Sequence, residues 1–176
     1  PAKAKVAAAL LLTLPGNPFI YYGEEIGMLG DKPDEFIREP FLWNVEGESN
    51  GQTHWEIPYA SNSNTVKPLF YQQDDPHSVF YAYKSLIKCR NESGALQKGW
   101  LQPLKQDNNK VIAFIRSIER ESVMVLINLS GQIQKIGSPE EIESYKVIYS
   151  SHDIFKSGGG VINLQPWSTF ILRYNN

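Results

Sequence analysis

The first part of the chain places its apolar residues in two different patterns. Apolar residues at helical spacing, in a stretch rich in alanine, predict a helix over residues 2–14. Pro15 should end this helix, because the residue before a proline is driven away from the helical conformation. An unbroken apolar run, Phe19–Tyr22, follows between Pro18 and Gly23. Such a run predicts a short strand over residues 18–22 that is buried on both faces, as in a parallel sheet.

A long stretch without periodicity comes next. Residues 27–73 are rich in Gly, Asn, Asp, Ser and Pro, and a loop of this length in a compact domain is usually functional or disordered. Its many aromatic residues argue against disorder. Asp75 then suits the N-cap of a helix and Pro76 its first position, so the sequence predicts a second helix over residues 76–91, with Gly94 as its stop.

After residue 97 the pattern changes to short β-rich runs separated by turn residues. These runs are residues 99–105, 110–117, 121–129, 132–136, 144–150, 160–164 and 167–174. Their regular spacing predicts an antiparallel sandwich or barrel. The run 121–129 is apolar on one face and nearly so on the other, as expected for a central strand. We therefore predict one domain over residues 1–97 and an all-β domain over residues 98–176.

Composition and charge remove several classes of function. The chain has 176 residues, of which 41% are hydrophobic and 20% charged, and a net charge of −2. The sequence has no cluster of basic residues of the kind that would suggest a nucleic-acid interface. The longest apolar run, Val6–Leu12, is too short to span a membrane, and no secretory signal is visible, so no membrane role is expected. A single cysteine, Cys89, rules out an internal disulfide and leaves the cellular compartment open.

Two adjacent carboxylates, Glu24 and Glu25, follow the predicted strand, at the end where barrels of parallel strands carry their chemistry. Two carboxylates can act together on one substrate only when both side chains face it. Neighbouring residues of a strand point to opposite faces, so this pair cannot face one substrate together. We interpret both as rim residues rather than catalytic ones.

The long loop offers better candidates for ligand contact. Arg38 suits either a sugar hydroxyl or an ion pair that orders the loop. The flat ring of Trp43 suits the apolar face of a sugar, whereas Trp55 and Tyr59 are interpreted as packing residues. The substrate-binding residues predicted here are therefore Arg38 and Trp43.

Other polar residues do not form a predicted metal or triad site. His54, His77 and His152 have no Cys, His or carboxylate partner at metal spacing. The pair Asp74-Asp75 is explained by helix capping. Residues 151–153 read Ser-His-Asp, but the members of a catalytic triad converge from distant segments. No metal site is expected, and Cys89 is interpreted as a buried helix thiol.

Four segments together resemble the C-terminal end of enzymes of the α-amylase family (glycoside hydrolase family 13). Residues 14–28, LPGNPFIYYGEEIGM, resemble the family's last barrel strand, and residues 32–43, KPDEFIREPFLW, resemble the following loop in its amylase and oligoglucosidase branch. Residues 75–78 and 83–87 are similar to the start and core of the eighth barrel helix. The β-rich tail is similar to the family's C-terminal sandwich.

The resemblance implies an α+β chain, with the last helix–strand–helix portion of a TIM (β/α)₈ barrel before an all-β Greek-key sandwich. Family members cleave α-glucosidic bonds with retention, using an Asp nucleophile, a Glu acid/base and a second Asp. These three carboxylates are expected upstream of Pro1, so this chain should be a truncated piece without activity of its own. The resemblance places Arg38 near the bond-cleaving subsites. It implies an α-glucan or malto-oligosaccharide substrate and calcium as the candidate ion in the parent enzyme, with no cofactor in this chain.

Two alternatives remain for the all-β domain. It binds a glycan through exposed aromatic residues such as Trp100, Tyr149 or Trp167, or it is a structural cover without a ligand; the absence of an aromatic cluster on one strand face favours the latter. A single strand with two flanking helices leaves apolar faces uncovered. We therefore expect the chain to self-associate through these barrel surfaces, or to be poorly ordered over residues 1–75. Linkage specificity, hydrolysis versus transfer, and chain-length preference are left open.

Overall fold

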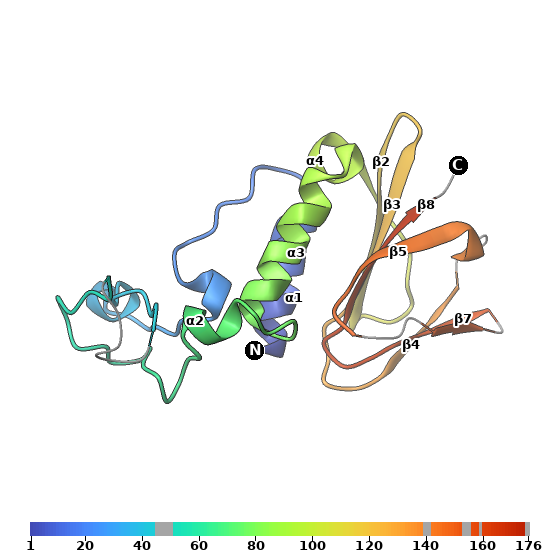
Figure 1. Cartoon of the computed structure of the whole chain (residues 1–176). Helices are drawn as coiled ribbons and strands as arrows, with labels where there is room; N and C mark the ends of the chain where they lie inside the picture. Colours follow the sequence, from blue (N-terminus) through green and yellow to red (C-terminus); the bar gives the residue numbers. More distant parts are fainter. Residues whose placement is uncertain (45–50, 139–141, 153–155, 159, 175–176) are drawn as a thin grey trace. The chain divides into compact units, whose positions relative to one another are not determined.

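The computed structural model describes residues 1–44, 51–138, 142–152, 156–158 and 160–174. Its residues divide into two compact units, which are considered separately below (Figure 1). One unit consists of Phe19–Lys84 together with Pro1, and the other of Ala2–Pro18 and Ser85–Asn176. The units do not divide at residue 97, because the first helix and residues 85–97 group with the strands. The predicted boundary between the two domains stays a prediction.

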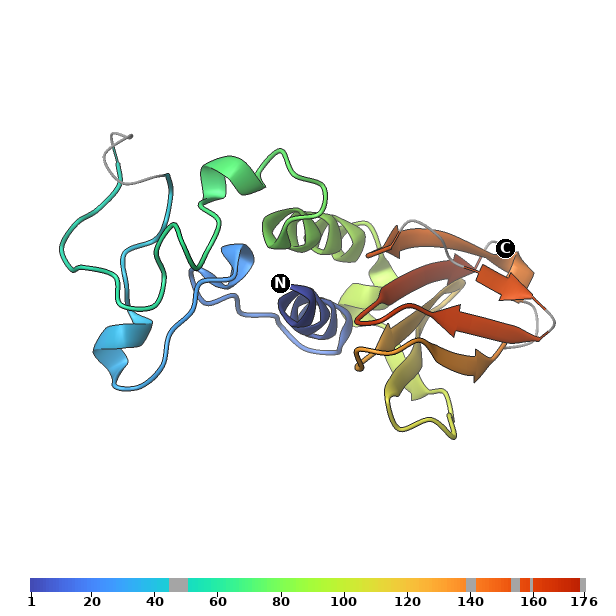
Figure 2. The ribbon, with the colours of Figure 1, turned by 90° about the horizontal axis from the view of Figure 1, so that it is seen from below.

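Three α-helices and the 3₁₀ helix η3 (Ile142–Ser144) contribute to the strand-bearing unit. Helix α1 (Ala2–Thr13) confirms the predicted first helix. Helix α3 (Val79–Asn91) contributes its C-terminal half, which lies beside α1 in both Figure 1 and Figure 2. Helix α4 (Gly94–Lys98) follows after a short turn and is capped by Ser93, whose hydroxyl oxygen accepts a hydrogen bond from the backbone N–H of Leu96. Gly94 therefore begins a new helix instead of only ending the previous one.

The strands of this unit form two antiparallel sheets. Their bounds are β1 (Trp100–Pro103), β2 (Val111–Ile118), β3 (Glu121–Asn128), β4 (Gln134–Gly137), β5 (Tyr145–Ser150), β6 (Lys156–Gly158), β7 (Val161–Leu164) and β8 (Thr169–Tyr174). The larger sheet has the order β1-β2-β3-β8-β5 and the smaller one the order β4-β7-β6. Seven of these strands match predicted runs, and β6 was not predicted. The all-β prediction is confirmed at the level of two antiparallel sheets, while the Greek-key connectivity stays a prediction.

A hydrophobic core joins the two sheets. It consists of Val111, Ala113, Met124, Leu126, Ile136, Ile162, Leu164, Phe170 and Leu172. Strand β3 lies in the middle of the larger sheet, and its residues Val123–Asn128 are all buried, which confirms the prediction of a central strand. Since side chains alternate along a strand, Val123, Val125 and Ile127 point away from this core. Helix α4 contacts β2 and β3, so helices cover the part of the larger sheet that the smaller sheet does not cover.

Two buried arginines hold the C-terminal end of α1. The last carbonyls of a helix have no partner within the helix and need one elsewhere. The guanidinium of Arg90 donates to the carbonyl oxygens of Leu12 at 2.8 Å, Leu14 at 3.2 Å and Gly16 at 2.6 Å. Arg116 of β2 donates to the carbonyl oxygen of Thr13 at 2.6 Å and is 1% exposed. These bonds attach α1 to α3 and to the larger sheet.

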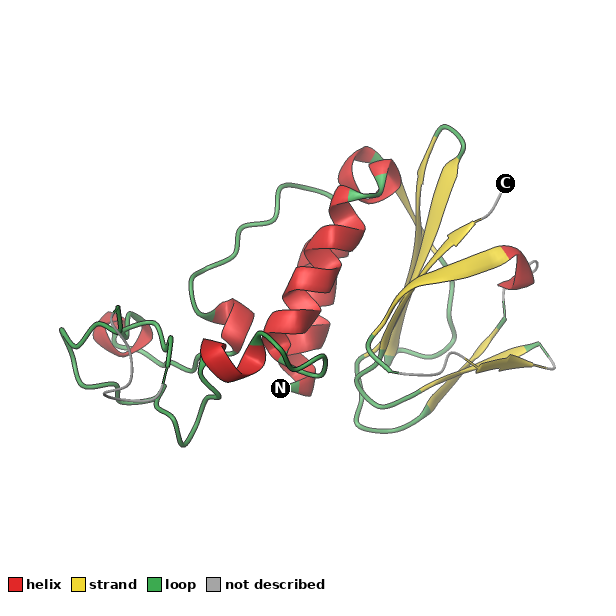
Figure 3. Ribbon diagram, in the orientation of Figure 1, coloured by secondary structure: helices red, strands yellow, loops and turns green. Residues whose placement is uncertain are grey.

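The other unit contains little regular structure. It holds the 3₁₀ helices η1 (Glu24–Ile26) and η2 (Asp34–Ile37) and the short helix α2 (Leu69–Gln72), and Figure 3 shows loop between them. The first turns of α3 also belong to it. Its core is a small cluster formed by Ile26, Leu42 and Val66, with partly buried apolar residues around it. The prediction that residues 27–73 are mainly loop is confirmed for the described residues, although most of the aromatic side chains in this stretch are exposed.

The predicted strand at residues 18–22 is wrong. Residues 18–21 have no regular secondary structure and Tyr22 lies in a turn, and the described residues supply no strand beside them. Their side chains are uncovered as well, with Phe19 86% and Tyr21 50% exposed. A strand requires a neighbour that pairs with its backbone, and an apolar run alone does not provide one.

Candidate functional site

The candidate site is a pair of loops in the Phe19–Lys84 unit, and a buried carboxylate joins them. Glu39 is 2% exposed. Its Oε1 accepts hydrogen bonds from the backbone N–H groups of Tyr59 and Ala60, both at 2.6 Å, and its Oε2 accepts one from Ser61 at 2.7 Å. Backbone amides are strong donors to a charged carboxylate. Glu39 thus fixes the second loop, around residues 59–61, to the first.

Two further side chains reinforce this junction. The hydroxyl of Ser61 donates to the carbonyl oxygen of Leu29 at 2.7 Å and accepts from the backbone N–H of the same residue at 2.8 Å. The amide of Gln52 accepts from the backbone N–H of Trp43 at 3.0 Å and donates to the carbonyl oxygen of Phe41 at 3.0 Å. The loops therefore form one cross-linked scaffold, although they have no sheet between them.

Both predicted substrate residues lie on this scaffold with exposed side chains. Arg38 directly precedes the buried Glu39, and its Nη2 lies 3.2 Å from Asp34 Oδ2 in an ion pair whose partners are both more than half exposed. Trp43 is 49% exposed, and its ring packs against Phe41 with 4.6 Å between ring centroids. The structure thus presents both groups at the surface of one loop, and their role in substrate binding stays a prediction.

The other two aromatic candidates of this loop differ from each other. Tyr59 stacks on Phe36 with 4.8 Å between ring centroids, but the tyrosine is still 73% exposed. Trp55 is 61% exposed. Packing therefore accounts for one face of Tyr59, and most of the Trp55 surface remains accessible.

Glu24 and Glu25 lie in η1 and not on a strand, so the alternation argument does not apply to them. Each carboxylate has a separate local partner. Glu25 Oε2 accepts from the backbone N–H of Gly23 at 2.8 Å, and Glu24 Oε2 lies 3.5 Å from the hydroxyl of Tyr83. Burial, followed by the charge of Glu24, raises the pKa of Tyr83 to about 12. In this contact the tyrosine hydroxyl donates and the Glu24 carboxylate accepts.

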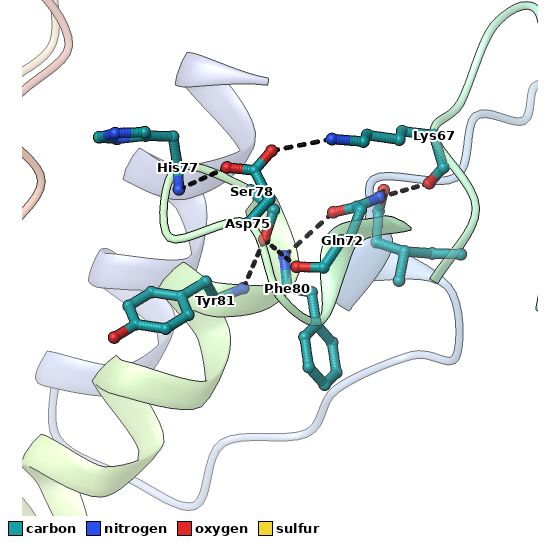
Figure 4. A network of polar contacts seen from close by, with 8 residues as sticks. Lys67, Gln72, Asp75, His77, Ser78, Phe80 and Tyr81 are labelled. Carbon is teal, nitrogen blue, oxygen red and sulfur yellow. Dashed lines mark hydrogen bonds and ion pairs between the residues drawn. The ribbon is translucent and has the colours of Figure 1, made fainter. Parts of the chain in front are cut away.

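A polar network fixes the start of α3, and its cap differs from the predicted one (Figure 4). Ser78 accepts from the backbone N–H of Tyr81 at 3.0 Å and so caps the helix, which begins three residues later than predicted. The buried amide of Gln72 accepts from the backbone N–H of Phe80 at 3.2 Å. The proposal that Asp75 is the N-cap and Pro76 the first helical residue is therefore wrong.

Asp75 has another role in this network. It accepts from the backbone N–H of His77 at 2.9 Å and forms an ion pair with Lys67 at 2.9 Å (Figure 4). The hydrogen bond from Lys67, followed by that from the His77 backbone, holds the pKa of the Asp75 carboxyl below its usual value.

No metal centre is evident in the part of the chain that the structure describes. There, no group of three or more His, Cys, Asp or Glu side chains gathers closely enough to hold an ion. Asp153 of the Ser-His-Asp sequence lies outside the described residues. The expectation of a calcium ion stays a prediction. Within the described residues, no helix is long and apolar enough to cross a membrane.

The aromatic candidates of the all-β region do not form a common platform. Tyr149 is 9% exposed, so the premise that it is an exposed aromatic residue is wrong. Burial raises its pKa to about 12. The ring of Trp167 lies under the ammonium of Lys3, 5.2 Å from the ring centroid. Trp100, at 86%, is broadly exposed. Cys89 is buried as predicted, and burial raises the pKa of its thiol to about 11.

Sequence reasoning missed the buried charges. Glu39 was passed over beside Arg38, and Arg116 inside an apolar strand pattern received no role. Buried ionisable residues need partners that satisfy them. The partners of Glu39 are backbone groups 20 to 22 positions away in the chain, and those of Arg116 lie 17 and 103 positions away. The interruption of an apolar strand by an arginine was the only signal available.

Two family models match successive stretches of this chain. A family model described as the α-amylase catalytic domain matches residues 1–99, and one for the C-terminal domain of α-amylase SusG matches residues 111–171. α-Amylase 3 from Dictyoglomus thermophilum is 37% identical over 97% of this chain and 34% of its own length. α-Amylase SusG from Bacteroides thetaiotaomicron is 35% identical over 84% of this chain and 22% of its own length.

Two solved structures are also similar to this chain over nearly its whole length. The crystal structure of an α-amylase from H. orenii superimposes with a TM-score of 0.83 at 33% identity, and the match covers 99% of this chain and 36% of that one. The Amy13B structure from Eubacterium rectale also gives a TM-score of 0.83, at 26% identity, with 99% and 35% of the two chains covered. The chain spans about a third or less of the length of these relatives.

Proposed function

This chain belongs to the α-amylase family of glycoside hydrolases, and we propose that it forms the C-terminal part of an enzyme that cleaves α-glucosidic bonds with retention. The match of its first 99 residues to the catalytic-domain model supports this proposal. So does the share of about a third that it covers in α-amylase 3. Retaining glycosidases need an acid/base carboxyl and a nucleophilic carboxylate. In this proposal both come from the preceding part of the enzyme.

The observation that carries the proposal is the cross-linked loop scaffold with its two exposed side chains. Glu39, the residue after Arg38, holds residues 59–61, and Gln52 bonds to the backbone of Phe41 and Trp43. Preorganised groups bind a ligand without a further loss of conformational entropy. In the assembled enzyme, Arg38 donates hydrogen bonds to sugar hydroxyls or orders a site carboxylate, and Trp43 covers the apolar face of a glucosyl ring. Both position the substrate, and neither transfers a proton.

An amylase assay tests the proposal that the catalytic carboxylates are not part of this chain. The purified chain should not hydrolyse starch or maltoheptaose, and measurable turnover that co-purifies with it would overturn the proposed location of the catalytic carboxylates. In the enzyme encoded by the complete reading frame, Trp43→Ala should raise KM for maltoheptaose. Trp100→Ala is the matched control, because this tryptophan is 86% exposed in the other compact unit. An equal effect of the two substitutions would contradict a substrate role for Trp43.

For the all-β region we propose a structural role and not a glycan-binding one. The burial of Tyr149 and the contact of Lys3 with Trp167 leave no row of aromatic faces among the described residues that would suit a sugar chain. The core between the sheets and the attachment of α1 through Arg116 support a role as a cover for apolar surface. Starch binding that is lost in Trp100→Ala would favour the binding role instead.

Self-association of the isolated chain belongs to the same proposal. Phe19, Ile20, Tyr21 and Tyr22 form a continuous run of exposed apolar residues. Uncovered segments of this kind bury themselves against another chain when one is available. In the parent enzyme the remaining barrel would cover this run, and in the isolated chain a second copy takes its place.

A further inference from the structure

A cavity of about 460 Å³ lies in the Phe19–Lys84 unit, and neither Arg38 nor Trp43 lines it. Residues 63–68 and Tyr71 line it. Val66 and Pro68 are buried and supply apolar surface, and Val66 also belongs to the core cluster of this unit. Cavities that bind small molecules typically measure about 300–1,000 Å³ and combine apolar surface with a few polar groups. This cavity falls within that range.

The turn on one side of the cavity is held rigidly by its own hydrogen bonds. The side-chain carbonyl of Asn62 accepts from the backbone N–H of Asn64 at 3.0 Å. The hydroxyl of Thr65 donates to the carbonyl oxygen of Ala60 at 2.7 Å and accepts from the backbone N–H of Asn62 at 3.0 Å. The carbonyl oxygen of Asn62 also accepts from Val66 at 2.9 Å. The cavity wall is therefore formed before any ligand arrives, which lowers the cost of binding.

The polar side chains at the cavity are available to a ligand. Within the described part of the chain, the side chains of Ser63 and Asn64 make no hydrogen bond, and both are exposed. Lys67 lines the cavity too, and its ammonium lies 2.9 Å from the carboxylate of Asp75 (Figure 4). Hydroxyl, amide, ammonium and carboxylate groups together can donate to and accept from neighbouring sugar hydroxyls. The paired charges nearly cancel, which favours a neutral ligand over an anion or a cation.

An aromatic ring completes the cavity. Tyr71 is 45% exposed, and Phe70 contacts its ring edge-on with 5.2 Å between centroids. One tyrosine surface is thus accessible while the neighbouring ring limits its motion. An accessible aromatic face beside hydroxyl-binding groups suits a pyranose, which has an apolar face and a ring of hydroxyls.

We propose that this cavity is a separate glycan-binding site, which holds a glucosyl residue of an α-glucan against Tyr71 with Ser63, Asn64 and the Lys67–Asp75 pair on its hydroxyls. The choice of α-glucan as the ligand rests on the proposed function. The site does not take part in bond cleavage; it holds the polymer to the enzyme at a second position.

Titration of the isotope-labelled chain with maltoheptaose tests the site, with amide chemical shifts as the readout. Up to about 10 mM ligand, shifts should concentrate at residues 63–71, and cellohexaose should produce weaker ones because its linkage differs. Tyr71→Ala should weaken binding about tenfold, and Tyr71→Phe should retain it because the ring face remains. Tyr81→Ala is the matched control, since Tyr81 is 41% exposed outside the cavity. No shifts at residues 63–71 in the unmodified chain, or equal binding by Tyr71→Ala, overturns the site.

The same titration separates this inference from the proposed function. Shifts confined to residues around Trp43, abolished by Trp43→Ala and not by Tyr71→Ala, would leave the proposed substrate loop intact and eliminate the second site. Binding at Tyr71 together with a complete enzyme that hydrolyses no α-glucan would preserve the site and eliminate the proposed catalytic role.

Discussion

Replacement of Arg116 by alanine should release the C-terminal end of α1 from the larger sheet. The guanidinium is 1% exposed and donates to two carbonyl oxygens, that of Thr13 at 2.6 Å and that of Gly99 at 2.9 and 3.2 Å. Alanine leaves both oxygens without these donors and opens a cavity in the buried layer. Because Thr13 is the last residue of α1, one of these oxygens belongs to a helix end that already lacks internal partners.

The size of the effect follows from these contacts. A buried acceptor left without a partner costs about 1–3 kcal/mol, so two cost about 2–6 kcal/mol. The cavity adds to this loss. Relief from burying a charge offsets part of it, and burial indeed lowers the pKa of the Arg116 guanidinium. We expect a net loss of about 3 kcal/mol for Arg116→Ala and about 2 kcal/mol for Arg116→Met, which fills the space without donating.

Hydrogen exchange measures this loss locally, which is necessary because two compact units need not unfold in one step. A loss of about 3 kcal/mol makes exchange roughly 100-fold faster at amides of α1. Arg38→Ala is the control, because its ion pair with Asp34 is largely exposed and worth less than about 1 kcal/mol. Unchanged exchange in α1 of Arg116→Ala would refute the conclusion that this arginine attaches the helix.

Three further substitutions or treatments test other parts of the structure. Glu39→Ala should speed amide exchange at residues 59–61 roughly 30-fold, because three N–H groups lose their acceptor. Equal protection of these amides in the variant and the unsubstituted chain would contradict the conclusion that Glu39 holds the two loops together. Cys89 should react with a disulfide reagent at pH 8 only as fast as the chain opens, and rapid labelling of the folded chain would disprove its burial. Burial raises the pKa of this thiol to about 11. The stability of the folded chain should therefore be fully present below the usual thiol pKa of about 8.5 and fall as pH rises towards 11. Phe19→Lys should shift the chain towards monomer in sedimentation velocity, unlike Trp100→Lys, and identical profiles would argue against association through Phe19–Tyr22.

Hydrophobic periodicity correctly predicted those elements whose apolar faces are covered by other described residues of the chain. Helix α1 and seven strands were found from periodicity and turn residues, because the groups that cover them lie in the same chain. The run Phe19–Tyr22 has an equally strong pattern, yet it is exposed, because a pattern specifies only that a segment needs cover. The start of α3 was misplaced for a smaller reason: both Asp75 and Ser78 are good capping residues, and packing around Gln72 selected the serine.

The candidate site was predictable only in part. Aromatic and arginine residues in a long loop led to Arg38 and Trp43, which do lie on one scaffold. The residue that builds this scaffold, Glu39, bonds to amides that follow about twenty residues later, and no local pattern indicates such a contact. The cavity beside Tyr71 likewise depends on how residues 62–65 fold back on themselves. Long-range polar contacts of this kind are specified by the whole structure.

The central claim is tested most directly by the anomeric form of the product released from maltoheptaose. The product of the complete reading frame that encodes this chain should release sugars first as the α-anomer, detected by proton NMR before mutarotation, whereas the present chain alone should release none. Initial release of the β-anomer, no hydrolysis by the complete product, or turnover by this chain alone would contradict the account.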